Sequence, residues 1–358
     1  MSSKVYFIPA SIKEGTSVIS EKARKLFEAA QFGKCFCAND FTAVKVHIGE
    51  RGNTTHLPAA CIKSLVEELL ARKAKPFITD SCVLYVGSRH NAIDHSIVAA
   101  EHGFSIQGLG VPFIVADGLS GMVETPVQID AILHKQVFIA SAIAQAHSIL
   151  SIAHFTGHPA ACLAATLKTL GMGCASKKGK MTQHSALTLS VTDNCQLCGI
   201  CYENCPAGAI TLDDVKAHID KTKCISCGQC LALCRFEAIN CDWGTETETF
   251  QKSIAEHALG VLKNKKGKAA FFNFAISITK DCDCFNISNM PQITEDIGIF
   301  ASTDPVAVDK ATLDAVQQRA GKELPKLIGN NQLNPNHQLD HAQAISLGTT
   351  DYDLINVQ

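Results

Sequence analysis

Two matched runs of cysteine have the clearest chemistry in this sequence. The first run consists of Cys195, Cys198, Cys201 and Cys205, and the second consists of Cys224, Cys227, Cys230 and Cys234. Both have the spacing C-x2-C-x2-C-x3-C, which is typical of chains that hold two [4Fe–4S] clusters, where the fourth cysteine of each run binds the other cluster. We predict one cluster on Cys195, Cys198, Cys201 and Cys234. We predict a second cluster on Cys224, Cys227, Cys230 and Cys205.

Two zinc sites are the alternative interpretation of these runs. Structural zinc sites usually take paired C-x2-C units, whereas each run here has three cysteines in succession before its fourth. The spacing therefore favours iron–sulfur clusters over zinc. Two adjacent cubane clusters predict one-electron transfer, with one cluster passing electrons to the other.

Three further cysteines lie where a ligand could be bound. Cys174 follows two glycines, and Cys282 and Cys284 form a C-x-C pair just after an apolar segment. Such a pair can chelate a metal or supply a reactive thiol. The neighbouring Asp281 and Asp283 would raise a thiol pKa unless a cation were present. This favours a third metal or cluster on Cys282 and Cys284, with Cys174 as a candidate catalytic thiol; a flavin is another cofactor that this site could use.

Several basic residues are weaker candidates. His154 and His158 are separated by Gly157 and precede Pro159, so a helix through both is disfavoured, and His158 is expected to cap a following helix. Either histidine could donate a proton, or both could be structural. Lys45 and His47 lie on the polar side of an alternating strand, which a solvated face explains equally well.

The segments that must position these residues alternate between strand and helix. Expected strands are 5–9, 42–48, 77–79, 113–116, 137–140, 149–153, 269–278 and 297–301. Expected helices are 20–32, 58–73, 159–170 and 305–319. This rhythm predicts an α/β fold with a mostly parallel sheet, which binds ligands outside the carboxyl ends of its strands.

The cysteine-rich segment interrupts this alternation. We expect residues 1–187 and 245–358 to form the two parts of one α/β domain. Residues 188–244 would be inserted between them as a small α+β domain, like a ferredoxin with two [4Fe–4S] clusters.

Motifs on both sides of the insert resemble a known family. These motifs are residues 45–55, 85–91, 154–158, 171–176, 281–284 and 297–305. In this order they resemble the uncharacterised iron–sulfur centre proteins, the domain of unknown function numbered 362, and the resemblance runs through nearly the whole chain. It implies an α/β domain carrying a two-cubane ferredoxin module, mostly in anaerobic prokaryotes, and it implies no particular reaction.

Composition excludes some classes of function. The chain has 358 residues with 17 cysteines, and its 32 basic and 34 acidic residues give a net charge of −2. A broad basic face for nucleic acid or an anionic membrane is therefore not expected. The N-terminus has no apolar segment typical of a secretory signal, and no segment is long and apolar enough to span a membrane. We expect a cytoplasmic protein, and the sequence does not indicate its oligomeric state.

Three functions remain open from the sequence. The first is an iron–sulfur oxidoreductase, whose clusters feed electrons to a small-molecule substrate in the α/β domain. Its candidate catalytic residues are His47, His154, His158 and Cys174, and its candidate binding residues are Lys45, Arg89 and Asp304. The second is an electron carrier or adaptor that docks a redox partner protein. The third is a labile-cluster assembly or sensing protein.

Overall fold

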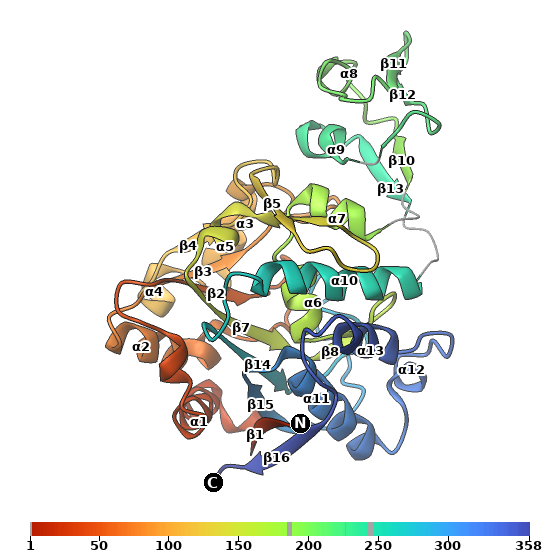
Figure 1. Cartoon of the computed structure of the whole chain (residues 1–358). Coiled ribbons are helices and arrows are strands. Elements are labelled where there is room, and N and C mark those ends of the chain that lie inside the picture. The colour runs from red at the N-terminus through yellow and green to blue at the C-terminus, as the bar shows by residue number, and fades with distance from the viewer. Residues whose placement is uncertain (1, 185–187, 226, 243–246) are drawn as a thin grey trace.

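An eight-stranded sheet forms the centre of the computed structural model, which describes residues 2–184, 188–225, 227–242 and 247–358. The strand order is β16–β1–β15–β14–β7–β2–β3–β4 (Figure 1). The strands are β1 (Ser3–Pro9), β2 (Phe41–Val46), β3 (Lys75–Asp80), β4 (Phe113–Val115), β7 (Ser148–His154), β14 (Ala269–Ala275), β15 (Gly298–Ser302) and β16 (Tyr352–Asn356). In this sheet β15 runs antiparallel to both neighbours, and every other pairing is parallel. The predicted mostly parallel α/β fold is confirmed.

Helices cover both faces of the sheet, because its central strands are apolar on both sides. One face packs against α1 (Thr16–Ala29), α2 (Lys63–Ala71) and α3 (Ala92–Glu101). The other packs against α6 (Thr166–Gly171), α10 (Thr247–Leu262), α11 (Pro305–Ala320) and α13 (Asn336–Ala344). Successive side chains of β14 point to alternate faces of the sheet. Phe271 packs on the face covered by α11, and Phe272 packs on the face covered by α1.

Shorter elements complete the α/β part. They are α4 (Ile106–Leu109), α5 (Ser141–Gln145), α7 (Lys177–Gln183), α12 (Leu324–Leu327), and 3-10 turns at Ile12–Glu14, Phe32–Cys35 and Ala59–Ile62. A two-stranded sheet pairs β5 (Glu124–Gln128) with β6 (Gln136–Ala140). The strand expected at 137–140 therefore exists, but it pairs outside the main sheet.

The prediction of a helix over residues 159–170 is wrong for the first half of this range. Residues before Thr166 form a hairpin of β8 (Thr156–His158) and β9 (Cys162–Ala164), in which Cys162 has a positive φ of 66°. Only α6 remains helical, and its N-cap is Ala165 rather than His158. A cap comes instead from α11, because the Asp309 carboxylate accepts hydrogen bonds from the backbone N–H groups of Thr166 and Leu167 at 2.8 Å.

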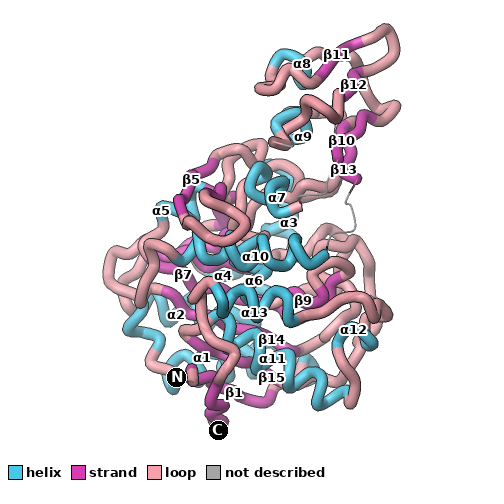
Figure 2. Tube along the Cα trace, turned by 45° about the vertical axis from the view of Figure 1, so that its right-hand side comes forward, coloured by secondary structure: helices cyan, strands magenta, loops and turns pink. Residues whose placement is uncertain are grey.

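The cysteine-rich segment projects from the α/β part beyond α7 (Figures 1 and 2). Its ends pair as antiparallel strands, β10 (Thr188–Val191) with β13 (Ile239–Asp242). Between them lie α8 (Ile200–Glu203), the hairpin of β11 (Ile210–Leu212) and β12 (Ala217–Ile219), and α9 (Gln229–Leu233). Each short helix begins inside one cysteine run, so the repeated motif has a repeated local structure.

The cysteine-rich segment packs on the α/β part through a small apolar cluster. Leu84, from the loop after β3, and Met181, from α7, join Leu189, Cys230 and Leu231 in it. Gly228 has a φ of +73°, and a Cβ at this position would lie 2.8 Å from Met181 Cγ. Cys230 of the second run therefore lies where the segment contacts the α/β part.

Candidate functional site

Two cavities in the cysteine-rich segment are lined by four cysteines each. Cys195, Cys198, Cys201 and Cys234 line the first cavity. Cys205, Cys224, Cys227 and Cys230 line the second cavity. The fold thus brings the fourth cysteine of each run to the first three of the other run. These are the two groups of ligands that the spacing predicts, and the binding of clusters to them stays a prediction.

The fourth cysteine of each run also accepts a backbone hydrogen bond. The N–H of Ala209 donates to Cys205 Sγ and the N–H of Ala238 donates to Cys234 Sγ, both at 3.3 Å. Donors of this kind stabilise the charge on a sulfur ligand and help to set the potential of a cluster. Within the described part of the chain, no three His, Cys, Asp or Glu side chains are grouped as a single metal ion would need.

A third cavity, of about 70 Å³, opens at the carboxyl edge of the main sheet. Lys45 reaches it from β2 and His47 from the residue directly after β2. Asp80 reaches it from the end of β3 and His154 from the end of β7. The loop after β14 adds Cys282, Asp283 and Cys284. This is the edge at which parallel α/β sheets bind their ligands.

Buried ion pairs form one wall of this cavity. Lys45 Nζ lies 2.9 Å from Asp80 Oδ1, and the Arg89 guanidinium lies 3.3 Å from both Asp80 Oδ2 and Glu50 Oε2. All four side chains are at most 5% exposed. Although burial opposes its charge, Lys45 and the nearby histidines hold the pKa of Asp80 well below its usual range. These buried ion pairs therefore hold the Lys45 and Arg89 side chains in place at the cavity.

The two cysteines of the C-x-C pair lie in a turn that also lines the cavity. The N–H of Phe285 donates to the carbonyl of Cys282 at 3.2 Å, which closes this turn. Cys284 Sγ lies 3.1 Å from His47 Nε2, and Cys282 Sγ lies 3.8 Å from Lys168 Nζ. The neighbouring Cys282 side chain lowers the pKa of Cys284 although burial opposes this, and His47 and Lys168 act in the same direction as Cys282.

His154 supports this turn rather than presenting a free nitrogen. Its Nδ1 lies 2.9 Å from Asp283 Oδ2, and its Nε2 lies 2.8 Å from the carbonyl of Ile276. Both partners are acceptors, so both ring nitrogens act as donors and the ring is an imidazolium. Burial disfavours that charge, but the pairing with Asp283 outweighs it and raises the pKa of His154.

Two lysines at the cavity were not predicted from the sequence. Lys168 comes from α6, and Lys180 comes from α7, where its Nζ donates to the Ala175 carbonyl at 2.6 Å. Both side chains are buried. In the sequence, Lys168 looks like the polar side of an amphipathic helix, and Lys180 belongs to a short basic run. Their burial depends on how α6 and α7 pack, and no local pattern indicates it.

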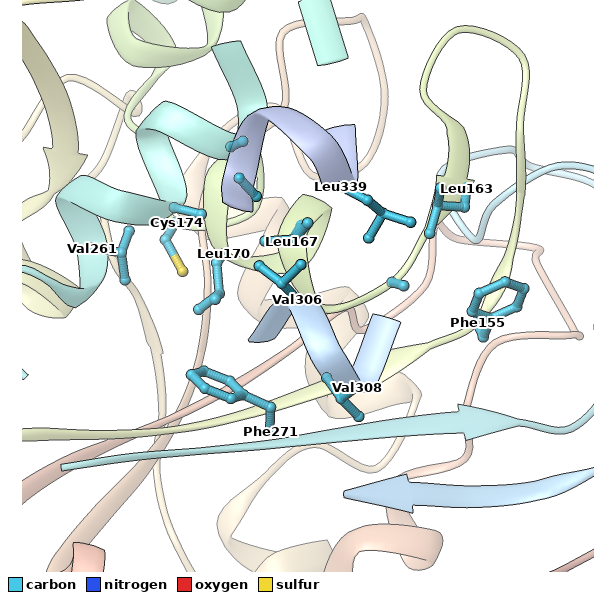
Figure 3. Close-up of a cluster of buried hydrophobic side chains, with 14 of the residues drawn as sticks. Phe155, Leu163, Leu167, Leu170, Cys174, Val261, Phe271, Val306, Val308 and Leu339 are labelled. Carbon is cyan, nitrogen blue, oxygen red and sulfur yellow. The ribbon is translucent and has the colours of Figure 1, made fainter. Parts of the chain in front are cut away.

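Three predicted site residues lie away from the cavity lining. His158 accepts hydrogen bonds at Nδ1 from the N–H groups of Ala160 and Ala161, within the β8–β9 hairpin. Cys174 is buried in the apolar cluster around α6, where burial raises its thiol pKa to about 12 (Figure 3). Asp304 caps α11 by accepting from the N–H of Val306. Because β15 is antiparallel, Asp304 follows it at the opposite edge of the sheet.

Residues 42–314 match the family profile described as "Domain of unknown function (DUF362)". The chain therefore belongs to this family, as the motifs in its sequence indicated. The matched region includes the cavity residues from Lys45 to Cys284 and both cysteine runs. Among the described residues, no helix has both the length and the apolar character needed to cross a membrane.

A curated relative matches a short part of the chain. It is a subunit of the ion-translocating oxidoreductase complex of Methanosarcina acetivorans, with 47% identity over 45 residues. The match covers 13% of this chain and 17% of that protein. The similarity is therefore local, and the chain spans less than a fifth of the length of that relative.

Two solved structures are distantly similar in fold. One is the lactate racemase apoprotein from Thermoanaerobacterium thermosaccharolyticum, at a TM-score of 0.41 and 10% identity, covering 89% of this chain and 56% of that one. The other is a structural-genomics protein from Thermotoga maritima, at a TM-score of 0.45 and 11% identity, covering 86% of this chain and 59% of that one. The chain thus spans a little over half the length of each.

Proposed function

We propose that this protein is an iron–sulfur oxidoreductase that carries electrons through two [4Fe–4S] clusters to the cavity at the carboxyl edge of its sheet. The observation that supports it best is the crosswise lining of the two cysteine cavities. Each cavity takes three cysteines from one run and the fourth from the other. Two-cluster ferredoxins bind their cubanes in this way.

The position of the cysteine-rich segment supports a route into the α/β part. Leu84 packs in the same apolar cluster as Cys230, which lines the second cavity. The hydroxyl of the next residue, Tyr85, donates a hydrogen bond to the carbonyl of Cys284 at 3.1 Å. One short loop therefore connects the second cysteine cavity with the cavity at the sheet edge, and the cluster on Cys205, Cys224, Cys227 and Cys230 would be the one that passes electrons on.

The charge around the sheet-edge cavity favours an anionic substrate. Lys45, Arg89, Lys168 and Lys180 line it, against the carboxylates of Asp80 and Asp283. Lys45 and Arg89 are already paired with carboxylates. Lys168 Nζ, by contrast, donates to Cys282 Sγ over a long contact of 3.8 Å. Lys168 is therefore the cation best placed to bind a negative group of a small substrate.

The test is the iron and sulfide content of anaerobically purified protein, measured with other metals and flavin. The proposal expects about eight irons and eight sulfides per chain, and reversible bleaching of the cluster absorbance by dithionite. Zinc in place of iron would contradict it. If the clusters can be reduced but the Lys168→Ala variant reacts with every tested anion as the native chain does, the cavity does not bind an anionic substrate through Lys168. This result would favour an electron carrier that docks a redox partner. Iron lost on dilution would favour a cluster-assembly or sensing role.

A further inference from the structure

Cys282 and Cys284 are two nucleophilic groups of the cavity, and they lie in one turn. Cys282 is 3% exposed, whereas Cys284 is partly accessible. The N–H of Phe285 donates to the carbonyl of Cys282 at 3.2 Å, and this hydrogen bond bends the chain between the two thiols. Side chains that meet across such a turn can form a disulfide without a large movement of the backbone.

Each sulfur has a cationic or N–H partner of its own. His47 Nδ1 accepts the backbone N–H of Gly49 at 3.0 Å, so in the neutral ring the proton lies on Nε2, which points to Cys284 Sγ. Lys168 Nζ lies beside Cys282 Sγ. The outer sulfur thus lies beside the N–H donor of His47, while the inner sulfur is buried beside the ammonium group of Lys168. This is the arrangement of an attacking and a resolving thiol.

The pair also lies at the end of the route described above. Tyr85 joins the carbonyl of Cys284 to the loop that packs on Cys230. The clusters change charge by one electron each, whereas most small substrates are reduced by two. A dithiol at the end of this route would collect two single electrons into one pair.

We propose that Cys282 and Cys284 form a dithiol/disulfide couple that takes one electron from each cluster and reduces small disulfides carrying acidic groups. This inference rests on the proposed electron-transfer function. In the first half-reaction, two electrons break the Cys282–Cys284 bond, one proton from water goes to Cys282, and Cys284 becomes the thiolate beside His47. The two electrons would come from the clusters held by the two cysteine runs, one from each, and a low-potential one-electron donor would replace them.

In the second half-reaction, the Cys284 thiolate attacks one sulfur of the substrate disulfide and releases the other half as a thiolate, which takes a proton from water. Cys282 then attacks Cys284 in the mixed disulfide, and its proton goes to the leaving sulfur. The Cys282–Cys284 bond is restored. In total, one substrate disulfide takes up two electrons and two protons and gives two thiols. The basic lining, above all Lys168, would hold an acidic group of the substrate.

Peptide mapping tests the couple directly. The tryptic peptide 281–310 contains Cys282 and Cys284 and no other cysteine. Anaerobic protein would be equilibrated with oxidised glutathione, alkylated and digested. We expect this peptide to be two hydrogens lighter and unalkylated, and to be doubly alkylated again after dithionite has reduced the clusters. A peptide that stays doubly alkylated, or that carries only glutathione, would overturn the proposal. A metal that is bound stoichiometrically by the native chain and is lost in the Cys284→Ser variant would also overturn the proposal.

A pair of tyrosine variants tests the coupling to the clusters. Tyr85→Phe removes the hydroxyl that contacts Cys284, and we expect the thiols of peptide 281–310 to reappear at least about tenfold more slowly, with cluster bleaching unchanged. Tyr6→Phe, on the distant strand β1, is the control and should recover at the native rate. Equal rates in both variants would overturn the coupling. Absence of iron from the purified protein would instead disprove the proposed electron-transfer function. The mass of peptide 281–310 would still show whether the Cys282–Cys284 disulfide forms.

Discussion

His47 Nε2 lies 3.1 Å from Cys284 Sγ, while His47 Nδ1 accepts the N–H of Gly49. These two contacts decide which nitrogen carries the proton of the neutral ring, and they direct that N–H at the sulfur. Residue 47 comes from the end of β2 and residue 284 from the loop after β14, so the contact exists only in the folded chain. It places a donor next to the more accessible sulfur of the C-x-C pair.

The reactivity of Cys284 should depend on this donor. We expect His47→Phe to slow alkylation of peptide 281–310 at pH 7 by about tenfold, because loss of the N–H makes the thiolate less favourable. His47→Gln keeps an amide N–H and should recover part of the rate. His218→Gln, in the exposed hairpin of the cysteine-rich segment, is the control. An unchanged rate in His47→Phe would contradict the assigned contact.

Crosswise cluster binding can be tested with two matched double variants. Cys195 and Cys234 line one cavity, whereas Cys195 and Cys205 line different ones. Replacing the first pair with alanine should leave one complete cluster and about four irons per chain. Replacing the second pair should damage both clusters and leave less iron. The reverse result would mean that each run binds its own cluster.

Asp309 should make stability depend on pH. Burial raises its pKa to about 6, although Asn273 and the first N–H groups of α6 donate to it. The folded state therefore holds this proton more tightly than the unfolded state. The resulting stabilisation is complete below about pH 4 and is lost as the pH rises through 6, by up to about 3 kcal/mol.

Urea unfolding at several pH values measures this effect. Asp309→Asn keeps the shape of the side chain but cannot titrate, so its free energy of unfolding should fall less between pH 4 and pH 7 than that of the native chain. Asp340→Asn, at an exposed position of α13, should follow the native chain. Parallel curves for the native chain and Asp309→Asn would contradict the shift.

Lys265 should destabilise the fold at neutral pH. Its side chain is 1% exposed, and burial lowers its pKa to about 8. Because the folded pKa lies below the unfolded value, the cost is largest below pH 8 and fades as the pH rises towards about 10.5. Lys265→Met should therefore raise the free energy of unfolding at pH 7 by up to about 3 kcal/mol, and by less at pH 10. The exposed neighbour Lys266→Met should change little at either pH.

The sequence by itself determined the features that depend on neighbours along the chain. The spacing C-x2-C-x2-C-x3-C fixes which sulfurs can reach a common centre, because only two or three residues separate them. The alternation at 42–48 and the helical spacing at 305–319 indicated β2 and α11. Lys45 and His47 were also identified, since they lie at the carboxyl end of a strand of the predicted parallel sheet, and Arg89 was identified as a basic residue in a loop.

Only the tertiary structure decided how distant segments combine. The reversed direction of β15 placed Asp304 at the far edge, and the β8–β9 hairpin replaced the first half of an expected helix. The burial of Lys168 and Lys180 followed from the packing of α6 and α7. These outcomes depend on strand order, strand direction and the packing of side chains between elements, which local propensity and spacing do not determine.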